Sequence, residues 1–273
     1  MFEFIEMKLR DQVFIILKND IRIPVLAHIP HSSTQIPDAL RKTILLDDEE
    51  LVEELLRMTD SYLDELFSSV MDEGGVATVF KLSRLIVDPE RFEEDEKEIM
   101  SSRGMGVIYT KTSNGSKLRE PPEEVERIEL LSQFYRPYHA ALEYEVQSLL
   151  DAFNRCLILD CHSFPSRPLP CELDQDPDRP DICLGTDPYH TPEALIESVE
   201  GFFYERGLKT AVNKPFGGTY VPMKFYQTEN RVSSVMIEVN RGLYMEEETG
   251  EKSASFDSLK ETISDLINHM PKE

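Results

Sequence analysis

The stretch Cys156-Leu-Ile-Leu-Asp-Cys-His-Ser163 is the most informative part of this chain. Its first four residues carry no polar side chain, and a short apolar run of this kind is typical of a strand buried on both faces of an α/β sheet. Functional groups in such sheets gather at the carboxyl ends of strands. Because side chains alternate along a strand, Asp160 and His162 share one face, and Cys161 points to the other. The stretch therefore predicts a site at the end of a central strand.

Turn residues and hydrophobic periodicity divide the rest of the chain into strands and helices. We expect further strands at 13–17, 23–27, 76–80, 85–87, 181–185, 208–212 and 233–241. We expect helices at 47–71, 123–153 (interrupted near Pro137), 192–206 and 256–269. Residues 101–122 contain several glycines and prolines, which predict a long loop or hairpin and a candidate lid.

Composition excludes several classes of partner. The 273 residues carry a net charge of −23, whereas binding to nucleic acid or to an anionic membrane needs a basic surface. No apolar run approaches the length of a membrane span, and the N-terminus lacks a signal-peptide pattern. The four cysteines show no CxxC spacing and are interpreted as reduced thiols, so we expect a cytoplasmic protein.

Histidines and acids occur next to the predicted elements. His31 follows the strand 23–27 as His162 follows its own strand, although the HxxH spacing of His28 and His31 is a weak signal in a loop. Asp60 lies beside the apolar stripe of the helix 47–71. A carboxylate there costs free energy unless it reaches water, is paired or hydrogen-bonded, or binds a metal. Glu238 is a lone carboxylate near the end of the strand 233–241.

Arg84 and Arg91 are close in sequence, and guanidinium groups bind carboxylates in a bidentate manner. Surface salt bridges are the alternative interpretation of this pair. His139, near the helix break, is most simply a packed or hydrogen-bonded helix residue.

The ordered series PHSS, TDSYLDELF, SRLIVDPERF, YRPYHAAL, LILDCHSFPS, DICLG, PFGGTY and MIEVNRGLYM resembles the N-formylglutamate amidohydrolase family over roughly residues 25–245. That family is similar in architecture to the zinc carboxypeptidases. The resemblance implies a three-layer α/β/α sandwich around a mixed central sheet, of the phosphorylase/hydrolase-like type, with residues 1–273 forming a single amidohydrolase domain.

The resemblance also assigns roles to eight positions: metal ligation to His31, Asp60 and His162; general-base catalysis to Glu238; and substrate binding to Arg84, Arg91, Asn240 and Arg241. It implies one catalytic zinc ion, although iron, cobalt and manganese also suit nitrogen and oxygen ligands. The implied reaction is hydrolysis of N-formyl-L-glutamate, or of another small anionic N-acyl amino acid, to formate and the free amino acid during amino-acid (histidine) degradation.

Some positions depart from the family pattern. Glu90 stands where the family often has Asn, His28 where many members have a small residue, and Lys224 near a position where a basic pair is common. Asp160 is a rival to Asp60 as third ligand, because it shares a face with His162. Same-face neighbours of this kind often orient a ligand instead of binding the metal.

Three other functions remain open from the sequence. One is a binding protein that keeps the fold without turnover, and another is a zinc carboxypeptidase-like amidase with a different substrate. The third, a serine or cysteine hydrolase using Ser163 or Cys161, is disfavoured because no GxSxG motif is present and Cys161 faces away from His162. The oligomeric state is not predicted.

Overall fold

The computed structural model describes residues 13–270. The N-terminal segment in which the sequence shows no signal-peptide pattern lies outside the described residues. None of the helices within 13–270 combines the length and the apolar character needed to cross a membrane. All four cysteines are free thiols.

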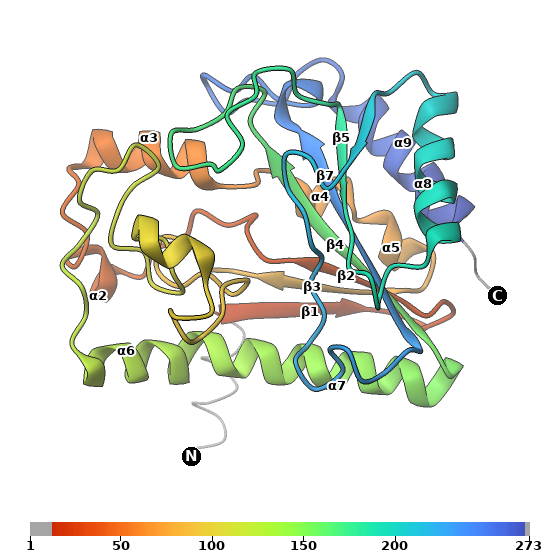
Figure 1. Cartoon of the computed structure of the whole chain (residues 1–273), viewed down its shortest axis with the longest axis horizontal. Helices are drawn as coiled ribbons and strands as arrows, with labels where there is room; N and C mark the ends of the chain where they lie inside the picture. Colours follow the sequence, from red (N-terminus) through yellow and green to blue (C-terminus); the bar gives the residue numbers. More distant parts are fainter. Residues whose placement is uncertain (1–12, 271–273) are drawn as a thin grey trace.

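One mixed sheet runs through the described chain in the strand order β1-β3-β2-β4-β7-β5-β6 (Figure 1). The strands are β1 (Phe14–Lys18), β2 (Val25–Ile29), β3 (Val76–Phe80), β4 (Cys156–Phe164), β5 (Ile182–Gly185), β6 (Thr210–Val212) and β7 (Val232–Asn240). Strands β3, β2, β4 and β7 are mutually parallel, whereas β1 and β5 run antiparallel to their inner neighbours. The predicted central strand is therefore β4, and it is buried along almost its whole length.

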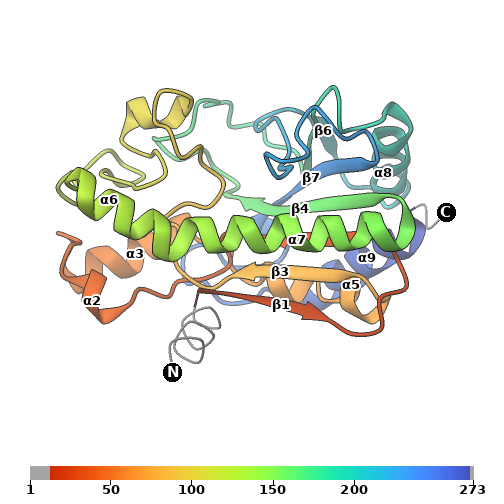
Figure 2. The ribbon, with the colours of Figure 1, turned by 90° about the horizontal axis from the view of Figure 1, so that it is seen from below.

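Helices cover both faces of this sheet. On one face lies the long α7 (Arg136–Phe153), which follows α6 (Glu124–Leu130) and a π-helical turn at Leu131–Tyr135 (Figure 2). On the other face lie α4 (Leu63–Leu66), α5 (Ser69–Asp72), α8 (Glu193–Glu205) and α9 (Phe256–His269). This confirms the predicted three-layer α/β arrangement.

The two apolar cores follow from the alternation of side chains along the strands. On β4, Ile158 packs toward α7, whereas Leu159 and Cys161 pack toward α8 and α9. Asp160 and His162 alternate with Leu159 and Cys161 and therefore lie on the α7 side. The sequence predicts that these two side chains share a face. The Sγ of Cys161 donates to the carbonyl of Leu159 on the opposite side.

Local signals explain several helix boundaries. The helix α3 (Asp48–Met58) begins with a capping box, because the Asp47 side chain accepts from the backbone N–H of Glu50 and the Glu50 side chain accepts from that of Asp47. A short helix, α2 (Asp38–Arg41), precedes it. Pro137 lies in the first turn of α7, directly after the π-helical turn at Leu131–Tyr135.

The prediction of one helix over 47–71 is wrong. The helix α3 ends at Met58 because Thr59 is extended and the backbone N–H of Asp60 donates to the carbonyl of His31, 2.9 Å away, instead of to a helical carbonyl. Tyr62 then adopts a left-handed conformation with φ 67° before α4 begins. Asp60 is thus placed by a break between helices and not by a helix face.

The predicted strand 85–87 is also wrong. The backbone N–H of Ile86 donates to the carbonyl of Ser83 within a turn. Leu85 and Val87 are nevertheless fully buried. A short buried apolar run does not distinguish a strand from a buried turn.

The segment 101–122 is the expected long loop. Its first three residues complete a 3-10 helix at Ile99–Arg103, and the rest carries only isolated bridges within the described chain. Glu54 of α3 accepts hydrogen bonds from the backbone N–H and the hydroxyl of Ser113, at 2.6 and 2.7 Å. Tyr109 and Leu118 are fully buried. These anchors favour a fixed wall over a mobile lid.

Candidate functional site

The candidate site lies at the carboxyl ends of β2, β4 and β7, on the face of the sheet that α7 covers. A cavity of about 530 Å³ opens there, and His31, Asp60, His162 and Glu238 all line it. The register explains why two of them meet, because His162 and Glu238 are paired residues on the parallel neighbours β4 and β7. Segments that are far apart in sequence therefore converge on one cavity.

His31 presents an unpartnered nitrogen to this site. Its Nε2 donates to Oδ1 of Asp88 at 2.8 Å, so in the neutral imidazole Nδ1 is the nitrogen with the free lone pair. That Nδ1 is buried and has no hydrogen-bond partner, although it lies 3.7 Å from Oδ2 of Asp60 and 3.8 Å from Oε2 of Glu90. A histidine whose far nitrogen donates to a carboxylate is the usual arrangement of a metal ligand.

Asp88 is itself held by cationic and hydroxyl donors. Its Oδ2 accepts from Nη2 of Arg84 at 2.8 Å and from the hydroxyl of Tyr109. Burial alone would raise the pKa of Asp88, but Arg84, His31 and Arg91 together hold it well below its usual value. The sequence predicts no role for Asp88. Its position as a carboxylate close to two candidate arginines was the signal that could have indicated a role in the site.

His162 lies between carboxylates. Its Nδ1 is 3.2 Å from Oδ2 of Asp60, and its Nε2 is 2.9 Å from Oε2 of Glu90 and 3.0 Å from Oδ1 of Asp160. Burial alone would lower the pKa of His162, but Glu90 and Asp160 raise it well above the usual value. This concentration of negative charge attracts a proton and would equally attract a metal cation.

Asp60 is fixed by groups on the side away from the histidines. Its Oδ1 accepts from Nη2 of Arg241 at 2.9 Å and from the hydroxyl of Ser163 at 3.2 Å, and its Oδ2 faces both imidazoles. Burial alone would raise the pKa of Asp60, but the neighbouring imidazoles of His162 and His31 and the charge of Arg241 hold it well below the usual value. Asp60 is therefore an ionised, positioned carboxylate.

Asp160 contacts the site from behind His162. Besides accepting from His162, it accepts from Nδ1 of His28 at 3.0 Å and from the backbone N–H of Tyr220 at 2.8 Å. The ring of His28 is fully buried and stacks on Tyr220 with 4.2 Å between ring centroids. These contacts support an orienting role for Asp160 and a packing role for His28.

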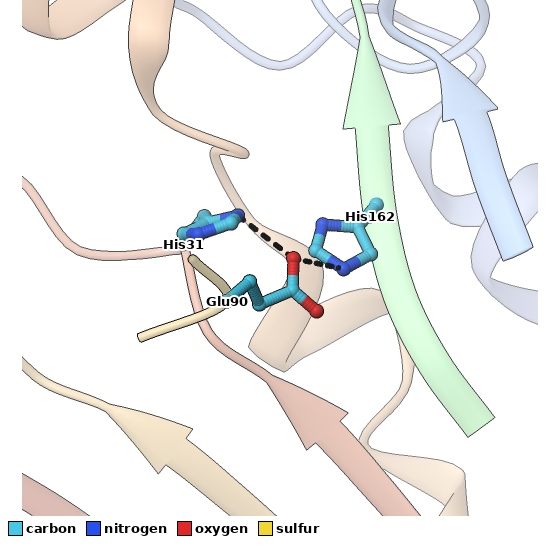
Figure 3. Close-up of side chains that lie close together, drawn as sticks. All are labelled: His31, Glu90 and His162. Atoms are coloured by element: carbon cyan, nitrogen blue, oxygen red, sulfur yellow. Dashed lines mark ion pairs between the residues drawn. The ribbon is translucent and has the colours of Figure 1, made fainter. Parts of the chain in front are cut away.

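Glu90 is a site residue that sequence reasoning noted only as a departure from the family pattern. Figure 3 shows its carboxylate between the imidazoles of His31 and His162. Within residues 13–270, two clusters have the spacing to hold a metal ion: His31 with Glu90 and His162, and His28 with Glu90 and Asp160. For Glu90, the position in a loop between two arginines was the signal in the sequence that could have indicated a role in the site.

Two donor sets are candidates for a divalent ion. The first is the predicted one: Oδ2 of Asp60 lies 3.7 Å from Nδ1 of His31 and 3.2 Å from Nδ1 of His162, but these three residues are not one of the two clusters with metal-binding spacing. In the second, Oε2 of Glu90 replaces Asp60 and His162 uses Nε2. Two nitrogens and one carboxylate oxygen are a common catalytic zinc set.

Glu238 is the group placed for proton transfer. Its Oε2 is buried without a hydrogen-bond partner. Burial is the main cause that raises its pKa to about 8, and the charges of Asp60 and Glu90 add to this effect, against the opposing influence of His162 and Arg241. A bound cation would lower this pKa toward the working range of a general base.

The four predicted substrate-binding residues differ in their contacts. Arg84 and Arg91 line the cavity, with side chains 14% and 23% exposed. Arg241 also lines it, but Nε donates to Ser163 and Nη2 to Asp60. Asn240 does not line the cavity, because its amide donates to the carbonyl of Pro180 and its oxygen accepts from the N–H of Gly242. The contacts of Asn240 and Arg241 favour structural support over substrate binding.

His139 lines the cavity at its α7 edge. Its Nε2 donates to the carbonyl of Pro89 at 2.9 Å, and its Nδ1 accepts from the hydroxyl of Tyr220 at 3.0 Å. Burial lowers the pKa of His139 to about 4. It is a neutral, hydrogen-bonded helix residue, as the sequence suggested.

Comparison with known proteins agrees with the resemblance. A family model described as N-formylglutamate amidohydrolase matches residues 23–245. An N-formylglutamate deformylase of Pseudomonas putida is 27% identical over 231 residues, covering 83% of each chain. One from Pseudomonas aeruginosa PAO1 is 28% identical over 240 residues, covering 83% of this chain and 84% of that protein. The crystal structure of an N-formylglutamate amidohydrolase from Ralstonia eutropha JMP134 superposes with a TM-score of 0.80 at 25% identity, covering 94% of this chain and 96% of that one.

Proposed function

The chain belongs to the N-formylglutamate amidohydrolase family, and we propose that it is a metal-dependent hydrolase of N-formyl or other small N-acyl amino acids. N-formyl-L-glutamate is the substrate named for its relatives. The products would be formate, or another small carboxylate, and the free amino acid. The buried, unpartnered Nδ1 of His31 is the observation that carries this proposal, because it faces Asp60 beside His162 and Glu238.

We assign metal ligation to His31, His162 and Asp60, with zinc as the expected ion. Asp60 is preferred to Glu90 because Arg241 and Ser163 hold its other oxygen in place, and a positioned ligand loses less freedom on binding. When bound, a zinc ion polarises a substrate carbonyl and lowers the pKa of water to about 7.

The remaining chemistry falls to side chains of this chain. Glu238 accepts the proton of the attacking water and donates it to the leaving nitrogen, which must be protonated to depart. Asp88 accepts a hydrogen bond from Nε2 of His31, and Asp160 accepts one from Nε2 of His162. These two hydrogen bonds keep the imidazoles oriented. Arg91, which lines the cavity with a side chain 23% exposed, binds the carboxylate of the substrate.

The test is metal content by elemental analysis for wild type, His162→Ala, Asp60→Asn and Glu90→Gln, together with hydrolysis of N-formyl amino acids. We expect about one zinc per chain in wild type, because three protein ligands define one catalytic site. We expect loss of metal in His162→Ala and Asp60→Asn and retention in Glu90→Gln. Loss in Glu90→Gln alone would assign the third ligand to Glu90.

A binding protein without turnover is the competing function. It would retain metal and ligand without hydrolysing any N-acyl amino acid. Wild-type protein that carries no metal, and that hydrolyses its substrates equally in the presence of a chelator, would refute the metal-dependent proposal itself.

A further inference from the structure

We infer that the substrate of this site is an N-acyl derivative of an apolar amino acid with a single carboxylate, and that the dianion N-formylglutamate is a poor substrate. This inference rests on the proposed amide hydrolysis and specifies its substrate class. It comes from three features of the cavity: the ion pairs that its arginines already form, the acid Glu90 that faces it, and its apolar walls.

The first feature is the number of cations available to a ligand. Four arginines line the cavity. Three already bind carboxylates of this chain: Arg57 at 2.8 Å, Arg84 at 2.8 Å and Arg241 at 2.9 Å. Arg91 is the one whose buried Nε lacks a hydrogen-bond partner among the described residues, and its nearest carboxylate oxygens lie 3.7 and 4.0 Å away. Arg91 pairs with Asp88 and Glu98 only at these longer distances, so it is the guanidinium best placed to bind one substrate carboxylate.

The second feature is an acid in the lining of the cavity. Glu90 faces the cavity with a side chain 15% exposed, and its neighbours within 4 Å are the imidazoles described above. Lys224 gives no compensation, because its Nζ donates to Gln147 of α7 and it does not line the cavity. A second carboxylate entering a partly desolvated, acidic cavity without a cation is disfavoured.

The third feature is the apolar wall. Five methionines line the cavity: Met58, Met100, Met105, Met223 and Met236. Methionine side chains are unbranched and adapt to apolar ligands of different shape.

The apolar lining continues to the mouth of the cavity. Phe92, Ile99, Leu173 and Met223 line it and are 43%, 68%, 57% and 63% exposed. Clustered exposed apolar side chains mark ligand-binding grooves. The volume of about 530 Å³ also falls in the range of ~300–1,000 Å³ that encloses drug-sized ligands.

The experiment compares N-formyl-L-leucine with N-formyl-L-glutamate on the zinc-loaded full-length protein. We measure kcat/KM for wild type, and dissociation constants by calorimetry on Glu238→Gln, which separates binding from turnover. We expect a preference for N-formylleucine of at least about tenfold in both readouts, the lower end of the discrimination that apolar pockets achieve.

Met223→Arg supplies a cation at the mouth, and Val52→Arg is the matched control. Val52 is 66% exposed, compared with 63% for Met223, and does not line the cavity. We expect Met223→Arg to reduce the preference for N-formylleucine several-fold and Val52→Arg to leave it unchanged.

The outcomes separate the inference from the proposed function. Equal use of both compounds, or a preference for N-formylglutamate in either readout, overturns the inference and leaves amide hydrolysis intact. Tight binding of N-formylleucine without turnover in wild type upholds the substrate class and overturns the hydrolase. No binding and no hydrolysis of either compound overturns both.

Discussion

Replacement of Asp88 by Asn should lower both the stability of the protein and the affinity of its candidate site for metal. Asp88 is fully buried. It accepts from Arg84 at 2.8 and 3.2 Å and from His31 at 2.8 Å. The isosteric amide keeps the volume but removes the charge. Arg84, whose side chain is 14% exposed, then has no carboxylate in contact, and His31 loses the acceptor that fixes its ring.

The expected cost follows from these contacts. Removing one partner of a buried ion pair costs about 3–5 kcal/mol, because the remaining charge stays buried. We expect the lower end, about 3 kcal/mol, since the amide oxygen still accepts one hydrogen bond. For a protein of this size that corresponds to a fall in Tm of roughly 6–12 °C. Loss of the carboxylate behind a metal-binding histidine should weaken zinc binding by about 10–100-fold.

The double variant Arg84→Met/Asp88→Asn makes the two effects distinguishable. It removes both charges, so most of the lost stability should return, whereas zinc affinity should stay low because His31 still lacks its carboxylate. Urea titrations give the stabilities, and competition with a chromophoric chelator gives the affinities. Asp88→Asn protein with wild-type Tm and wild-type zinc affinity would refute the reasoning about this site.

Three further predictions concern catalysis, pH and helix capping. Glu238→Gln should lower kcat by about 10²–10⁴-fold while retaining the metal; unchanged kcat would remove Glu238 from the mechanism. The pKa of His139 is about 4 in the folded protein against about 6.5 when unfolded, so the unfolded chain binds the proton first and stability falls as the pH drops from 6.5 toward 4. We expect a loss of about 3 kcal/mol that His139→Gln abolishes in urea titrations at pH 7 and pH 4. An equal loss in the variant would contradict this account. Asp47→Ala should cost about 1 kcal/mol through loss of its cap, and Asp48→Ala, whose side chain is 98% exposed, should cost clearly less; equal costs would argue against the capping box.

Much of the fold is predictable because it depends on local patterns. Alternation along 156–164 and 232–240 places His162 and Glu238 on one face, and the apolar run identifies β4 as the buried centre of the sheet. The predictions that failed depend on competing tertiary contacts. The helix after Asp47 ends at Met58 because the backbone of Asp60 pairs with His31, a partner 29 residues earlier in the chain (60 minus 31).

The eight motifs in their order were sufficient to identify the family, and they predict the residue types of the candidate site. Alternation and strand ends could also indicate which side chains point toward one edge of the sheet. The chain alone did not reveal the roles of Asp88 and Glu90, because hydrogen-bond partners depend on three-dimensional proximity and not on spacing along the chain. Folding brings Asp88 within 2.8 Å of His31 and Glu90 within 2.9 Å of His162, and it commits Arg84 and Arg241 to carboxylates of the protein itself. The charge left for a ligand therefore depends on which ion pairs the packed structure has already formed.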